Sequence, residues 1–597
     1  MYSNEHPLRQ RFDDRVLCPP RKLEGEQASA TVSELSLDRR SSAASTVARL
    51  DPNDMSRRTI LFVVVAASPA ACSHAPPQTA MVVQQGAPAP RRDPGYSINA
   101  AELRRDLFIF ADDSFRGRET GTPEALHAAA FLARRVQQLG LEPAGDSLYL
   151  QRVPLVRERF ARTTQLSVTS GNGRAQSLRL GADVIPAISL GPDSPPVSRN
   201  AEGEIVFVGN GPSTDNEAAS LTALNLEGKV VVTVVDVPAK ATADQKRAAD
   251  EAMTYRTVRL MALHPSAIVY LMTGAKEDDY QRELPTLLRN VVLDGPSAAE
   301  APDTGQHLPM LLIGPARHGS PLLPVRWPND VRAQSLGRQF SGHVEIDRVP
   351  FTGYNVVAVV RGLDPRLNKT YLAYGAHYDH LGIVPSMSSA RRRMVDTIAN
   401  GADDDGSGSV ALLAIAQQMM IYRPRRSVLF VWHVGEEKGL LGSTYFTSHP
   451  TVPIDSIVTE FNADMIGRND SNTVALIGPR AAPNYLSWRV GMVVDSVNRA
   501  MPTPLHIDRT QDDPDDPERI YQRSDHYNYA KKNIPVIFFT TGMHEDYHRV
   551  TDEASKIDYD KMARISRLML DAGLVVANRS TRPTSEAVTQ SISSRQH

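Results

Sequence analysis

The chain has 597 residues, of which 41% are hydrophobic and 22% are charged, and its net charge is −2. This length exceeds one ordinary hydrophobic core, so two domains of a soluble globular class and some tail are expected. The balanced charge points away from a nucleic-acid partner. The only two cysteines, Cys18 and Cys72, exclude a disulfide scaffold and a cysteine-ligated metal in the core.

The N-terminal region carries the pattern of an export signal. Residues 1–54 are polar and rich in Arg and Ser, and we interpret them as a non-structural leader produced by a misassigned start. Residues 55–72 run from basic through apolar to small side chains, as in a secretory signal peptide. Two alternatives stay open at its end: Cys72 is incidental, or it resembles a lipobox cysteine that carries a lipid anchor. Both predict an exported protein that is periplasmic, a membrane-anchored lipoprotein or secreted.

The globular part is expected to begin near residue 95, after a Pro-, Ala- and Gln-rich linker over 73–94. Helical spacing predicts a helix that starts near Ser97 and a second one over Pro123–Leu139. Alternating apolar residues from about Leu148 to Leu180 predict strands. Residues 95–180 are therefore the first part of a domain.

Residues 181–344 have a different character. Short apolar runs such as 204–209, 228–235 and 266–272 alternate with Gly and Pro. We interpret 181–344 as a small β-rich domain that is inserted into the first one.

The pattern from 345 to 578 predicts a mostly parallel mixed sheet with helices on both faces, an α/β fold. Helices are expected over Ser409–Tyr422 and Tyr485–Met501. Between the helices lie near-continuous apolar runs, which are typical of strands buried on both faces. These runs are Asn355–Val360, Tyr371–Gly375, Ser427–His433, Ser456–Asn462 and Val536–Phe539. The Ser/Thr/Gln-rich residues 579–597 are expected to be a disordered tail.

Residues able to bind a metal follow five of these predicted elements, where α/β sheets bind ligands. His377 follows a strand, and Asp379 two residues later suits the support of a ligating imidazole. Three adjacent carboxylates, 403–405, open the predicted helix from Ser409, and they repel one another unless solvated or facing a cation.

The other three segments add carboxylates, an imidazole and a phenol. Glu436 and Glu437 follow a strand, where one carboxylate can bind a metal while the other accepts a proton from water. Asp464 follows the next strand. Near the last strand lie His548, a candidate ligand, and Tyr547, a candidate donor to an oxyanion. Each of these five segments by itself would also suit a capping or surface role. Five such segments next to successive predicted elements instead predict a metal-dependent hydrolase site.

These motifs resemble the M28 family of co-catalytic zinc aminopeptidases. The likeness is carried by His377-Tyr-Asp-His-Leu-Gly, Asn400-Gly-Ala-Asp-Asp-Asp-Gly-Ser-Gly, Gly435-Glu-Glu-Lys-Gly, Asn462-Ala-Asp-Met-Ile-Gly and Tyr547-His548. Arg116-Gly-Arg-Glu-Thr-Gly matches the family's usual opening. The inserted stretch 181–344 resembles a protease-associated (PA) domain, although His264-Pro-Ser-Ala267 stands where such domains have Gly-Ala.

The resemblance implies two zinc ions per chain, peptide substrates and the zinc exopeptidase fold. It implies that Asp404, the middle of the three aspartates, bridges the ions. It further implies that His377 and Asp464 bind one zinc ion, that Glu437 and His548 bind the other, that Glu436 is the general base and that Asp379 orients His377.

Other readings of the same residues remain. A carboxypeptidase of the same fold would use the same metal ligands. A single-zinc cyclase is disfavoured because both His377 and Asp464 are present. A non-catalytic binding ectodomain with PA-like and peptidase-like parts would be expected to have lost ligands, and all five are retained. The sequence does not give an oligomeric state.

Overall fold

The computed structural model describes residues 98–186, 198–209, 221, 224–288, 290–294, 309–329, 332–384, 396–483 and 486–583. The expected leader, signal peptide with Cys72 and linker lie outside the described residues, as does the expected tail beyond residue 583. Within the described part, no helix combines the length and apolarity that a membrane crossing requires.

The first sheet is mixed, and its central strands are parallel. Four neighbouring strands, β15, β12, β16 and β19, all run in the same direction, so their carboxyl ends lie at one edge. From one side to the other, the order is β9 (Asn290–Leu293), β2 (Leu150–Phe160), β11 (Gln334–Val360), β15 (Ser427–His433), β12 (Tyr371–His377), β16 (Ile457–Ala463), β19 (Val536–Thr540), β17 (Thr473–Ile477) and β18 (His506–Asp508). The short β1 (Glu142–Pro143) pairs with the end of β11.

Apolar side chains cover both faces of this sheet, because consecutive residues of a strand point to opposite sides. Phe430 and Trp432 of β15 pack in one core, whereas Leu429 and Val431 pack in another. The first core includes α1 (Ala100–Phe110), α2 (Pro123–Gln138), α6 (Gly408–Tyr422), α8 (Trp488–Ala500) and α10 (Tyr559–Asn578). The second core includes α7 (Leu441–Ser448) and α9 (His526–Ala530). The predicted α/β class, with helices on both faces, is confirmed.

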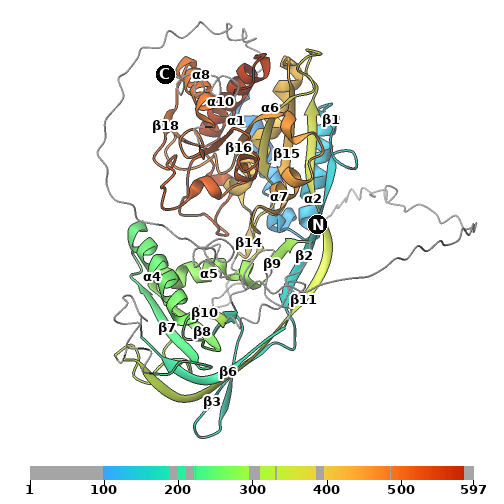
Figure 1. The fold of residues 1–597 in the computed structure, drawn as a ribbon. Helices are drawn as coiled ribbons and strands as arrows, with labels where there is room; N and C mark the ends of the chain where they lie inside the picture. The colour runs from blue at the N-terminus through green and yellow to red at the C-terminus, as the bar shows by residue number, and fades with distance from the viewer. Residues whose placement is uncertain are drawn as a thin grey trace, which may run out of the picture. The chain divides into compact units, whose positions relative to one another are not determined.

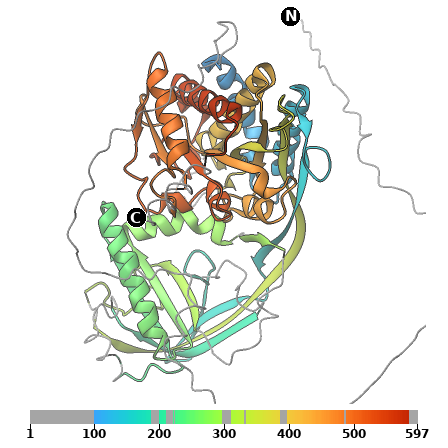
Figure 2. The same ribbon diagram turned by 45° about the horizontal axis from the view of Figure 1, so that its top comes forward.

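A second sheet contains the strands expected in the inserted stretch. β6 (Ser198–Phe207), β7 (Val230–Val237), β8 (Ala267–Thr273) and β10 (Met310–Pro315) are parallel neighbours. The helix α4 (Ala243–Met261) packs against β7 and β8, as Figures 1 and 2 show in green. A further helix, α5 (Gly274–Leu288), follows β8. The sheet also includes β3 (Gln165–Ser170), β4 (Ala175–Leu178) and β5 (Ile185–Pro186).

The strand β11 differs most from the expected elements. The sequence predicted a strand only over 355–360, whereas β11 has 27 residues. Its first part pairs with β3 and β6 in the second sheet, and its last part pairs with β15 in the first. In its first part, buried side chains such as Phe340 and Val344 alternate with exposed or partly buried ones, some of which are charged, so this part lacks the continuous apolar run that marked the other strands.

Candidate metal centre

All eight predicted site residues lie near the carboxyl ends of the parallel strands. His377 is the last residue of β12, and Asp464 directly follows β16. Glu437 lies in the loop after β15, and His548 lies in the loop after β19. Asp404 lies in the short helical segment η3 (Ala402–Ser407), which leads into α6.

Asp404 is the one of the three consecutive aspartates that faces the imidazoles. Its Oδ1 lies 3.2 Å from His377 Nε2, and its Oδ2 lies 3.4 Å from His548 Nε2. Asp403 instead accepts a hydrogen bond from the backbone N–H of Gly467 (2.7 Å). Asp405 accepts hydrogen bonds from the N–H groups of Gly408 (2.8 Å) and His377 (3.2 Å). The two oxygens of Asp404 are therefore directed at two different imidazoles.

Two groups of donors lie on either side of Asp404. On one side, His377 Nε2 lies 3.6 Å from Asp464 Oδ1 and 3.9 Å from Glu436 Oε2. On the other side, His548 Nε2 lies 3.1 Å from Glu437 Oε2. These distances bring together all five predicted ligands and the predicted base.

His380 is a neighbour of this centre that the sequence analysis missed. It is fully buried, and its Nδ1 lies 2.6 Å from Glu437 Oε1 and 3.8 Å from Asp404 Oδ2. His380, Asp404 and Glu437 form one group of convergent donor atoms, and His377, Glu436 and Asp464 form a second one. The available signal was a second imidazole three residues after His377.

Asp379 holds the loop of the predicted base. Its Oδ1 accepts hydrogen bonds from the N–H groups of Gly435 (2.8 Å) and Glu436 (3.2 Å). The same oxygen lies 3.9 Å from His377 Nδ1, whereas the backbone oxygen of Asp379 lies only 3.1 Å from that nitrogen. In this arrangement the nearest partner of the imidazole is the Asp379 carbonyl group.

Two further residues position ligands. The hydroxyl of Ser524 donates a hydrogen bond to Asp464 Oδ2 (2.7 Å). The carboxylate of Asp552 accepts hydrogen bonds from the N–H groups of Asp403 and Asp404, at 3.0 to 3.1 Å. These contacts leave the other oxygen of Asp464 and both oxygens of Asp404 facing the centre.

The excess of buried carboxylates controls the charge of the imidazoles. Burial lowers the pKa of His377, but the carboxylates of Glu436 and Asp464 outweigh burial and hold this pKa well above its ordinary value. The pKa of His548 is likewise raised against the effect of burial, chiefly by Glu437. Burial, together with Asp464 and Glu437, raises the pKa of the Glu436 carboxyl group well above its usual range. Without a cation, these two imidazoles and the Glu436 carboxyl group therefore hold their protons more strongly than the free side chains do.

The donor set fits zinc. His377 Nε2 is buried and makes no hydrogen bond of normal geometry, although oxygens of Asp404 and Asp464 lie within 3.6 Å. Donor atoms that converge in this way, without bonding to one another, suit a shared cation. Imidazole nitrogen and carboxylate oxygen are the usual zinc ligands when cysteine is absent.

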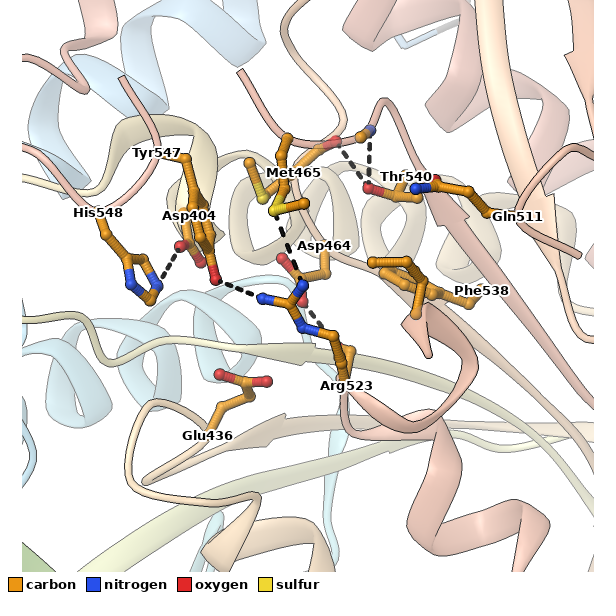
Figure 3. Close-up of a pocket in the computed structure, with 14 residues that line it drawn as sticks. Asp404, Glu436, Asp464, Met465, Gln511, Arg523, Phe538, Thr540, Tyr547 and His548 are labelled. Atoms are coloured by element: carbon orange, nitrogen blue, oxygen red, sulfur yellow. Dashed lines mark hydrogen bonds and ion pairs between the residues drawn. The ribbon is translucent and has the colours of Figure 1, made fainter. Parts of the chain in front are cut away.

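A pocket opens beside the donors (Figure 3). Its apolar walls include Met465, Ile520, Phe538 and Met543. Asp404, Glu436, Asp464 and His548 also line it, together with Tyr547 and Arg523. Arg523 Nη2 donates a hydrogen bond to the Tyr547 hydroxyl group (3.3 Å). Burial raises the pKa of Tyr547 well above its ordinary value, so the phenol stays protonated and can donate a hydrogen bond.

Residues 355–573 match the family model described as peptidase family M28. A probable leucine aminopeptidase 2 of Aspergillus oryzae is 33% identical over 22% of this chain and 21% of its own length. A probable leucine aminopeptidase of Trichophyton verrucosum is 28% identical over 35% of this chain and 55% of its own length. The chain thus spans about half or less of the length of these curated relatives.

Among solved structures, an aminopeptidase from Aneurinibacillus sp. strain AM-1 is similar, with a TM-score of 0.49 and 16% identity. The likeness covers 81% of this chain and 95% of that one. For a zinc aminopeptidase from Bacillus subtilis, the TM-score is 0.47 and the identity 15%, over 82% of this chain and 97% of that one.

Proposed function

We propose that this chain, whose residues 355–573 belong to peptidase family M28, is a zinc-dependent aminopeptidase. The observation that carries the proposal is the position of Asp404, whose two carboxylate oxygens face His377 and His548 at 3.2 and 3.4 Å. A carboxylate placed between two ligand groups suits a bridge between two metal ions. The fungal relatives are named probable leucine aminopeptidases, and these names support the same activity.

Two zinc ions per chain are proposed. His377 and Asp464 would hold one ion, Glu437 and His548 would hold the other, and Asp404 would bridge them. His380 lies close to Glu437 and is therefore a neighbour of the second ion's ligands. His380 would orient Glu437, because a close polar neighbour of a ligating carboxylate restricts its direction.

Side chains of the protein would transfer the protons of the reaction and stabilise the negative charge that develops on the substrate. Bound zinc supplies an acidified water and polarises the scissile carbonyl. Glu436, which lines the pocket, accepts the proton of the attacking water and then passes it to the leaving amine. The Tyr547 hydroxyl group donates a hydrogen bond to the oxyanion, and Arg523 fixes the direction of that hydroxyl group.

The pocket indicates the preferred substrate. The apolar walls formed by Met465, Ile520, Phe538 and Met543 suit a large apolar side chain at the peptide's N-terminal residue. A leucine-like residue is therefore the expected first residue of the substrate.

A second candidate activity is that of a carboxypeptidase. Arg523 lines the pocket, and the residue as a whole is exposed. Its guanidinium group can form a bidentate pair with the terminal carboxylate of a peptide. We rank this activity second because Arg523 already donates a hydrogen bond to the Tyr547 hydroxyl group and because the fungal relatives are named probable leucine aminopeptidases.

The test uses the purified full-length chain and three substrates: a leucyl chromogenic amide, an N-blocked peptide with a free C-terminus, and a peptide blocked at both ends. The leucyl amide should be cleaved, the chelated protein should be inactive, and zinc should restore activity. Cleavage of the N-blocked peptide from its C-terminus would instead support the carboxypeptidase. A preparation that binds no zinc would support the non-catalytic binding ectodomain.

Glu436→Gln tests the proton-transfer role. The variant should retain its zinc and lose about 10²- to 10⁴-fold in kcat, because the amide cannot accept the proton. Glu251→Gln, which changes an exposed glutamate of α4, is the control and should leave kcat unchanged. A zinc-loaded Glu436→Gln enzyme with full activity would contradict the assignment.

Three expectations from the sequence also remain proposals. Residues 55–72 direct export, with secretion or a lipid anchor at Cys72 as the outcome. Residues 95–180 and 345–578 form the peptidase domain, and 181–344 form a PA-like insertion.

A further inference from the structure

A short segment at residues 118–120, far from the metal ligands in sequence, contacts residues that flank those ligands. Arg118 ends η1 (Asp113–Arg118), and Glu119 and Thr120 follow it. All three are buried, with exposed fractions of 0%, 6% and 3%. The segment lies outside residues 355–573, which match the peptidase family.

Arg118 connects two of the loops that carry predicted ligands. Its Nε donates to the carbonyl oxygen of Tyr378 (2.7 Å), the residue after His377. Its Nη1 and Nη2 donate to the carbonyl oxygens of Asn400 (2.7 Å) and Gly401 (2.8 Å), just before the aspartate cluster. The rigid, planar guanidinium group therefore fixes the distance between these two loops.

Thr120 and Glu119 reach the remaining parts of the centre. The Thr120 hydroxyl group donates a hydrogen bond to Asp379 Oδ2 (2.7 Å), while Oδ1 of the same carboxylate holds the loop of Glu436. Glu119 Oε1 lies 3.4 Å from Lys438 Nζ, and this ion pair is buried. Lys438 follows Glu437 directly in the chain.

Charge gives the segment a second effect on the centre. Burial lowers the pKa of Arg118 to about 10, which still leaves the guanidinium group charged at neutral pH. The carboxylates of Asp552, Asp379, Asp405 and Asp404 act on it in the opposite direction. A fixed positive charge at this position reduces the repulsion among the carboxylates. Without it, bound zinc alone would have to offset this repulsion.

We propose that residues 118–120 are positioning residues. They fix the segments that carry His377, Asp404 and Glu436/Glu437 relative to one another, and they thereby set the zinc affinity of the centre. The inference rests on the proposed function only in that the centre binds zinc. Residues that support metal ligands typically contribute about 10- to 100-fold in metal affinity.

The test measures zinc affinity of the full-length chain by competition with a chelator, and the thermal midpoint of the metal-free protein. Arg118→Ala would unpair several buried carbonyl groups and endanger folding, so the main variant is Thr120→Val, which removes only the hydroxyl group. Thr120→Ser restores a hydroxyl group. Thr233→Val is the matched control, because Thr233 of β7 is fully buried and its hydroxyl group donates to the Gly209 carbonyl oxygen (2.8 Å).

We expect Thr120→Val to weaken zinc binding by about 10- to 100-fold, Thr120→Ser to recover most of this loss, and Thr233→Val to bind zinc like the wild type. If Thr120→Val lowers only the thermal midpoint, and binds zinc as tightly as Thr233→Val, the segment has a structural role alone and the proposal is wrong. A wild-type chain that binds no zinc would overturn the proposed function itself, an outcome distinct from equal binding by wild type and variant.

Discussion

At the scale of single residues, the centre combines buried imidazoles with a larger number of buried carboxylates. His377 and Asp405 are fully or almost fully buried, and Glu437 lies between two imidazoles. Burying unpaired charges in this way is costly, and the cost is relieved by protons or by a metal ion. Protons and zinc should therefore compete for the same side chains.

This competition predicts how the metal-free protein responds to pH. The pKa values of His377 and His548 are raised above 6.5 in the folded state. Their stabilising contribution is therefore complete below the unfolded value, and it is lost as the pH rises through the folded value. We expect the thermal midpoint of the chelated protein to fall as the pH rises above about 6.5.

The zinc-loaded protein is the control for this measurement. Zinc replaces the protons, so its thermal midpoint should fall less over the same pH range. A chelated protein whose midpoint stays constant or rises with pH would contradict the charge distribution described for the centre.

The sequence predicted the residue types of the centre better than their exact roles. Only resemblance singled out Asp404, because Asp403 and Asp405 are chemically identical to it; the directions of the three carboxylates separate them in space. His380 was missed because a second histidine three residues after a candidate ligand is a weak signal by itself, and its contact with Glu437 depends on a different loop.

At the scale of elements, η1 shows how backbone conformation brings a segment close to the centre. Gly117 has a φ of +71°, and a Cβ at this position would lie 2.3 Å from the Ala399 carbonyl oxygen and 2.8 Å from the Gly382 Cα atom. Both neighbours, Arg116 and Arg118, also have positive φ values. Only glycine permits this close approach without moving the segment.

Gly117→Ala should therefore destabilise the protein and weaken zinc binding. Gly173→Ala is the matched control: its φ is +78°, but nothing lies within 4 Å of an added Cβ. The control should cost about 1–2 kcal/mol, which reflects the left-handed conformation alone. Urea unfolding should show a larger loss for Gly117→Ala, and equal losses would mean that the contact with Ala399 relaxes freely.

At the scale of the whole molecule, the predicted metal ligands lie at or after strands of the first sheet, or in η3, which leads into α6. The second sheet has its own core, in which β7 and β8 pack against α4. The strand β11 contributes to both sheets. A bound ligand stabilises only those regions whose local unfolding disrupts its binding site. Zinc should therefore protect the first sheet, and not the second, against local unfolding.

Hydrogen exchange with and without chelator can measure this effect. Removal of zinc should speed amide exchange in peptides that cover β12 and β16, while peptides from β7 and β8 serve as the internal control and stay unchanged. A uniform increase in both sheets would show that they open as one cooperative unit.

The sequence by itself determined the class of the fold, the order of the central strands along the chain and the positions after them where ligands occur. These features are local: apolar periodicity marks each strand, and the ligand follows within a few residues. Tertiary structure alone decided the direction of Asp404, the length of β11 and the place of Arg118 behind the centre. The bonds from Arg118 to Tyr378 and Asn400 span 260 and 282 residues, and such contacts depend on how the sheet brings distant loops together.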